Sequence, residues 1–225
     1  MKKTFYSEAA YFLGTFLLAL SAALMERADM GMSMIVAPAY LLHLKVSRFL
    51  PWFSFGVAEY AVQAMLLVFL CLVLRRFKIS YLFSFLSAVL HGLILDVLIY
   101  LLSFAPADHP AFRMTYFVLG LLVGGAGISF LFHTYLAPEV YELFVKEWAD
   151  KSRWPAGRCK TIYDITSCAV SVLLSFLFFG FGHFEGIKWG TVVCALVNGW
   201  LIDRISRILD RHVDFKDGLK LRKYF

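Results

Sequence analysis

The chain has 225 residues, of which 60% are hydrophobic and only 17% are charged, and its mean hydropathy is +0.72. Soluble globular domains are about 45–50% apolar and about 25% charged, so this composition excludes an ordinary soluble domain and indicates a membrane protein with several spans. The net charge of +6 is not accompanied by aromatic or base-reading motifs, so we expect no nucleic-acid partner.

Six apolar runs are long enough to cross a hydrocarbon core, which takes about 20 residues. In chain order they are residues 9–25, 53–74, 79–104, 114–132, 162–181 and 187–209. The first run follows Lys2 and Lys3 as a signal peptide would, but no cleavage site ends it and more spans follow. We therefore interpret it as an uncleaved span. The last run carries Asp203 and Arg204, which makes its end the least certain.

Each half of the chain has one shorter segment between its first and second span. Residues 31–45 contain Pro38, and residues 136–148 contain Pro138, Glu139 and Glu142. Charge distribution alone would also allow both segments to cross, which would give eight spans. Their length and the two glutamates favour re-entrant or interfacial helices instead. Irregular backbone at membrane depth is tolerated where it lines a wet cavity, so we expect these segments to form walls of a site.

Similar sequences recur about one half of the chain apart. Residues 88–96 read AVLHGLILD and residues 195–203 read ALVNGWLID, which aligns His91 with Asn198 and Asp96 with Asp203. The chain therefore divides into a half at 1–107, a half at 108–209 and a basic tail at 210–225. Because each half has three spans, the second half enters the membrane in the opposite direction. The predicted fold is all-α, with six transmembrane helices as two inverted three-helix repeats; the alternative is chance similarity between apolar helices.

Basic residues are distributed unequally between the two sides of this topology. Most lysines and arginines fall on the side that holds both termini. Since cytoplasmic loops are enriched in Lys and Arg, we expect both termini in the cytoplasm and the basic tail close to anionic lipid headgroups.

Two glycine-containing motifs carry a resemblance to a known group of proteins. Residues 28–36 read ADMGMSMIV, and residues 186–191 read GIKWGT and lead into Asn198 and Gly199. These motifs resemble the YczE/YyaS/YitT group of bacterial membrane proteins. The resemblance implies a small multi-pass protein of the bacterial cell membrane that transports a solute, with no agreed functional residues. The second half departs from the pattern, because Leu136, Ala137 and Pro138 stand where a glycine turn is expected.

Acids at membrane depth are costly, so retained ones usually face the bundle interior and have a function. Glu59 and Gln63 are four residues apart and share one helix face. The repeat predicts that Asp164 enters from the opposite side and approaches Glu59 near the pseudo-axis. The alternatives for both acids are structural pairing and exposure among headgroups.

Four further polar residues are candidates for a substrate- or ion-binding site. Asp96 is flanked by apolar residues, and Gly92, four residues earlier, predicts a close helix contact, as Gly199 does in the second half. His91 relays protons or packs as a satisfied core residue, and Asn198 occupies its place in the repeat. Asp29 and Ser33 form an outer gate or one wall of the site, unless Asp29 only belongs to a solvated helix end.

The sequence contains no H-E-x-x-H, G-x-S-x-G or Walker A motif, so we expect no enzyme. Its acids, histidines and cysteines do not fall at metal-ligand spacings, so we expect no metal and no cofactor. The predicted function is a secondary transporter for a small solute, coupled to protons or sodium, with the lipid bilayer as its surroundings. The alternatives are a binding subunit of an energy-coupled uptake complex and a non-transport membrane partner protein. A homodimer is left open.

Overall fold

The computed structural model describes residues 3–75, 77, 79–136, 139–154, 156–181 and 188–219. Within them the chain forms eight helices between two short strands. The elements follow one another as β1 (Lys3–Tyr6), α1 (Ser7–Ala28), α2 (Ala37–Val46), α3 (Phe55–Leu74), α4 (Ile79–Leu102), α5 (Pro110–Phe132), α6 (Val140–Ser152), α7 (Ala156–Phe179), α8 (Trp189–His212) and β2 (Val213–Lys216).

Five of the described helices, α1, α3, α4, α5 and α7, are long and apolar enough to cross a membrane. They coincide with the first five of the six expected spans. Helix α8 has 24 residues, but its second half carries Asp203, Arg204 and Arg207, and it is not among the five. Helices α2 and α6 have 10 and 13 residues. At about 1.5 Å per residue neither is long enough for a core about 30 Å thick.

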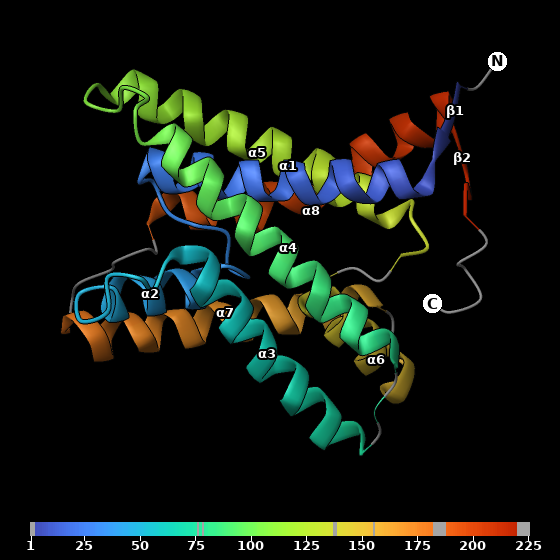
Figure 1. Ribbon diagram of the computed structural model, residues 1–225, viewed down its shortest axis with the longest axis horizontal. Helices are drawn as coiled ribbons and strands as arrows, with labels where there is room; N and C mark the ends of the chain where they lie inside the picture. Colours follow the sequence, from blue (N-terminus) through green and yellow to red (C-terminus); the bar gives the residue numbers. More distant parts are fainter. Residues whose placement is uncertain are drawn as a thin grey trace.

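The helices pack in two groups that α4 joins diagonally (Figure 1). In one group α1 packs along α5, with α4 against α1 and α8 against α5. In the other group α2 contacts α3 and α7, and α6 contacts the same two helices. Small residues allow the close approach of α1 and α5: a Cβ on Gly127 would lie 3.0 Å from the Gly14 carbonyl oxygen.

The crossing of α3 and α4 is closer still and depends on two glycines. A Cβ on Gly56 would lie 2.1 Å from the Gly92 carbonyl oxygen, and one on Gly92 would lie 2.8 Å from the Gly56 carbonyl oxygen. The predicted packing role of Gly92 is therefore confirmed. The same prediction for Gly199 is wrong, because no described atom lies within 4 Å of the place where its Cβ would be.

The fold is mostly helical, as expected for an all-α membrane protein, and two short strands pair beside the helices in a small parallel sheet. Strand β1 pairs with β2, with Lys3 opposite Val213 and Tyr6 opposite Lys216. Part of the expected basic tail is thus ordered structure: α8 continues to His212 and β2 follows. The pair β1 and β2 lies at one end of the molecule, beside the start of α1 (Figure 1).

Candidate functional site

A buried cluster of polar side chains joins α3 to the start of α6. Glu59 and Gln63 lie one turn apart on α3 and are fully buried. The Gln63 amide nitrogen donates to the Glu139 Oε2 at 3.0 Å and lies 3.4 Å from the Glu59 Oε2. The Gln63 carbonyl oxygen accepts from the Val140 N–H at 3.1 Å. The Tyr141 hydroxyl donates to the Glu59 Oε2 at 2.9 Å. Gln63 therefore links an acid from each half of the chain.

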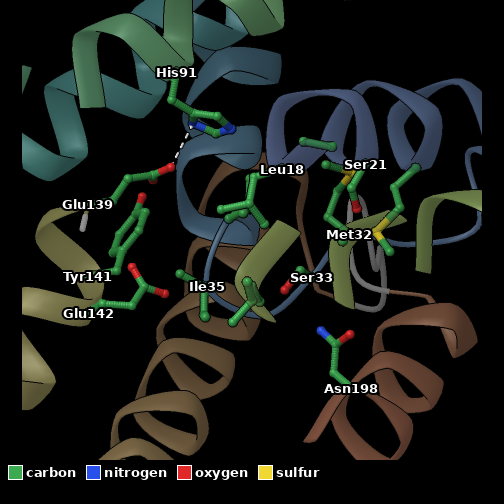
Figure 2. A pocket seen from close by; sticks show the side chains of 15 residues that line it. Leu18, Ser21, Met32, Ser33, Ile35, His91, Glu139, Tyr141, Glu142 and Asn198 are labelled. Carbon is green, nitrogen blue, oxygen red and sulfur yellow. Dashed lines mark ion pairs between the residues drawn. The ribbon is translucent and has the colours of Figure 1, made fainter. Parts of the chain in front are cut away.

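His91 extends this cluster from α4. Its side chain is almost fully buried, and its Nδ1 lies 3.5 Å from the Glu139 Oε1 (Figure 2). Within the described part of the chain, the Glu59 Oε1, the Glu139 Oε1 and both His91 nitrogens have no hydrogen-bond partner. Leaving a buried polar group unpaired costs about 1–3 kcal/mol. The cluster therefore has spare donor and acceptor capacity where a protein normally leaves none.

Burial also affects the protonation of Glu139, which precedes α6. Removal from water disfavours the charged carboxylate and raises the pKa of Glu139 to about 7, although the hydrogen bond from Gln63 acts in the opposite direction. Glu139 is therefore a buried acid that holds its proton more readily than a glutamate in water does.

A cavity of about 70 Å³ lies against the cluster. On this measure a water molecule needs about 10–15 Å³, so the cavity has room for several. His91, Glu139, Tyr141 and Glu142 gather at one side of the view and Asn198 lies at the other, with Ser33 and apolar side chains between them (Figure 2). The residues that line it are Leu18, Ser21, Ala22, Met25, Met32, Ser33, Ile35, Val36, His91, Gly124, Ile128, Glu139, Tyr141, Glu142 and Asn198.

Both halves of the chain contribute to the cavity wall through corresponding elements. The first half supplies α1, the segment before α2, and α4; the second half supplies α5, the start of α6, and α8. The segment before α2 is held by the Ser33 carbonyl oxygen, which accepts from the Val36 and Ala37 N–H groups. Gly31, with φ +110°, makes the turn that returns the chain to the cavity.

The predicted site residues separate into three groups. Ser33, His91 and Asn198 line the cavity. Glu59 and Gln63 lie behind its wall, in contact with lining residues. The repeat predicted that Asp164 approaches Glu59. The second-half acid that Gln63 links to Glu59 is instead Glu139. Asp164 lies half-buried on α7 and is not part of the cavity wall.

Asp96 has a local structural role that the sequence did not indicate. It accepts a hydrogen bond from the Gly56 N–H at 2.7 Å and another from the Ser54 hydroxyl. Ser54 is also the N-cap of α3 and accepts from the Val57 N–H. The positive end of the α3 dipole favours a carboxylate at this place. Asp96 therefore fixes the start of α3 and is not part of the cavity wall.

Asp29 also lies outside the wall, in an exposed cluster of charges. It ends α1 with φ 50°. Its carboxylate pairs with Arg113 at 2.6 Å and with Lys188 at 2.5 Å. These contacts join the end of α1 to the first turn of α5 and to the residue before α8. Asp29 thus connects helix ends and does not face the site.

Glu139, Tyr141 and Glu142 line the cavity; the segment 136–148 that holds them was expected to form a wall of the site, but none of the three was named as a site residue. Their signal was present: two acids follow a proline in a segment too short to cross the membrane. No group of three His, Cys, Asp or Glu side chains within the described residues is arranged to hold a metal ion.

A family model described as "Family of unknown function (DUF6198)" matches residues 5–207, so the chain belongs to this family. The match does not name the YczE/YyaS/YitT group that the sequence resembles. No curated protein and no solved structure matches the chain.

Proposed function

We propose that this member of the DUF6198 family is a secondary transporter that moves a small solute across the bacterial cell membrane by alternating access. The observation that carries the proposal is the cavity with buried atoms of Glu139 and His91 at its polar end that have no hydrogen-bond partner among the described residues. Ionisable groups inside a membrane protein are expensive and usually mark a substrate or ion pathway. Glu139 provides a proton-accepting group for coupling.

The proposed architecture is a pair of inverted repeats, with α1–α4 equivalent to α5–α8 and with α8 as the sixth span. Six of the helix contacts support it, because they form three equivalent pairs; the α3–α4 contact has no counterpart of similar extent between α7 and α8 among the described residues. Contacts of α1 with α4 and of α5 with α8 correspond, as do those of α2 with α3 and α6 with α7, and of α2 with α7 and α6 with α3. A site at the interface of such repeats is the common arrangement in secondary transporters. By the charge rule both termini are cytoplasmic.

Two polar contacts at opposite ends of the antiparallel α1–α5 pair serve as gates in this proposal. At one end Asp29 pairs with Arg113. At the other, the Tyr135 hydroxyl donates to Glu8 at 2.6 Å, and Glu8 also accepts from the Gly218 and Leu219 N–H groups. Each contact joins the end of one helix to the beginning of the other. Opening one while the other holds exposes the cavity to one side only.

The proposal is tested with the purified full chain in liposomes that contain a pH-sensitive dye. Panels of amines, amino acids, sugars and inorganic cations are added with and without imposed proton and sodium gradients. We expect at least one solute to accumulate in a gradient-dependent way. Ser33→Phe should abolish this movement, because the ring enters the cavity while the Ser33 carbonyl that starts α2 remains. Ser103→Phe, at an exposed position after α4, is the matched control and should transport normally.

Two results would overturn the proposal. One is solute movement that is equal in the Ser33→Phe variant and in the unmodified protein. The other is transport that occurs only when a co-purified ATP-hydrolysing complex is present, which would favour a binding subunit of an energy-coupled system.

A further inference from the structure

We propose that the cavity binds a small alkylammonium ion, with its N–H groups donated to Glu139 and His91 and its alkyl part against the methionines of the opposite wall. The inference rests on the proposed function, since it identifies the class of solute that the transport site accepts. It follows from the unused hydrogen-bonding capacity at the polar end and from the mainly apolar character of the remaining wall, which also includes Ser21, Ser33 and Asn198.

The unused capacity at the polar end fits an ammonium group. The Glu139 Oε1 is an acceptor, and a neutral imidazole offers one acceptor nitrogen. An ammonium carries three donors and no acceptor, so it satisfies both atoms at once. The two acceptors are close together, because the Glu139 Oε1 and the His91 Nδ1 are 3.5 Å apart. No Lys or Arg lines the cavity within the described residues, so nothing on its wall repels a cation.

The rest of the wall fits a short alkyl group. Met25, Met32, Val36 and Ile128 present flexible or branched apolar side chains to the cavity, and methionine adapts to irregular apolar shapes. The cavity of about 70 Å³ has room for several water-sized groups. A ligand of three to four heavy atoms, such as ethylammonium, is therefore the size that it accepts in this conformation.

Proton and ligand compete for Glu139. Binding of the ammonium requires the Glu139 carboxylate, so a Glu139 that is protonated before binding releases its proton to the solvent as the cation enters. The raised pKa of Glu139, about 7, places this exchange in the physiological range. The titratable groups that face Glu139 are Tyr11 from α1, Glu59 from α3 behind Gln63, His91 from α4, and Tyr141 and Glu142 from α6.

The test measures equilibrium binding of ethylammonium to the detergent-solubilised full chain by titration calorimetry. Ethanol at equal concentration serves as the neutral analogue, and sodium chloride controls for ionic strength. We expect saturable binding of ethylammonium alone, about tenfold weaker at about pH 6 than at about pH 8, as linkage to a group with this pKa requires. Repeating the titration in buffers of different ionisation enthalpy should show about one proton released per cation at the lower pH.

Glu139→Gln should abolish binding and proton release, because it keeps an acceptor for Gln63 and removes the charge. Glu26→Gln, which changes an acid on α1 outside the cavity wall, should change neither. If Glu139→Gln does not fold, the titrations of the unmodified protein with ethylammonium and ethanol still test the inference. Absence of saturable ethylammonium binding, equal binding of ethanol, or binding without proton release would each overturn the inference. Binding without transport in liposomes would overturn the proposed function alone, and transport of a neutral solute unaffected by ethylammonium would overturn this inference alone.

Discussion

Substituting single glycines by alanine tests the helix packing that positions the site. Gly56→Ala brings a Cβ to 2.1 Å from the Gly92 carbonyl oxygen, whereas ordinary contact begins at 3.4 Å, so α3 and α4 must separate by about 1.3 Å. The nearest atom, the Gly92 carbonyl oxygen, belongs to the backbone of α4 and cannot move aside as a flexible side chain could. Overpacking of this kind costs about 1–3 kcal/mol, and the hydrogen bond from the Gly56 N–H to the Asp96 carboxylate adds about 1.5–3 kcal/mol when it breaks.

The expected total for Gly56→Ala is a loss of about 2.5–6 kcal/mol of unfolding free energy. For Gly92→Ala the close contact is 2.8 Å, and we expect a loss of about 1–3 kcal/mol. Gly199→Ala meets nothing within 4 Å and should stabilise α8 by about 0.5–1 kcal/mol, because alanine loses less backbone entropy in a helix. The three variants are thus ranked by geometry alone, although Gly92 and Gly199 occupy the same place in the repeat.

The assay is intrinsic-fluorescence thermal unfolding in one detergent at one protein concentration. For a chain of this size about 1 kcal/mol corresponds to about 2–4 °C in Tm, so Gly56→Ala should lower Tm by at least about 5 °C and Gly199→Ala should raise it slightly. If Gly56→Ala melts with the unmodified protein, the α3–α4 crossing described above is wrong. If Gly199→Ala is as harmful as Gly92→Ala, α8 is packed as α4 is.

Two further predictions separate structural from functional polar residues. Asp96→Asn should keep ligand binding and lower the free energy of unfolding by about 1 kcal/mol, since one side-chain oxygen still accepts from the Gly56 N–H. Asp96→Ala should lower it by about 1.5–3 kcal/mol. Thermal unfolding measured beside a binding titration separates this loss of stability from a loss of the binding site. Gln63→Leu leaves the Val140 N–H and the Glu139 Oε2 without their present partner, so it should cost at least about 2 kcal/mol. Unchanged Tm in Gln63→Leu would show that the cluster is not formed as described.

The sequence determined the class of the protein and the order of its elements. Hydropathy can be read from each local stretch of sequence. Because unpaired polar groups in lipid cost several kcal/mol, a transmembrane segment must be apolar along its length. The hydropathy along the chain therefore located five spans and the two short segments that hold α2 and α6. Polar side chains in apolar runs were also visible individually, which is why His91, Asn198 and Ser33 could be named before their common cavity was known.

Tertiary structure decided which polar groups meet and what each one does. Asp96 was a candidate ligand by its depth, but the approach of Gly56 on α3 makes it a helix cap. Gly199 has a local sequence similar to that of Gly92, yet no helix packs against it among the described residues. Glu139 became part of the cavity because Gln63, far away in sequence, accepts from the first N–H of α6. Local sequence sets the cost of burying a polar group, whereas only three-dimensional packing supplies the partner that offsets it.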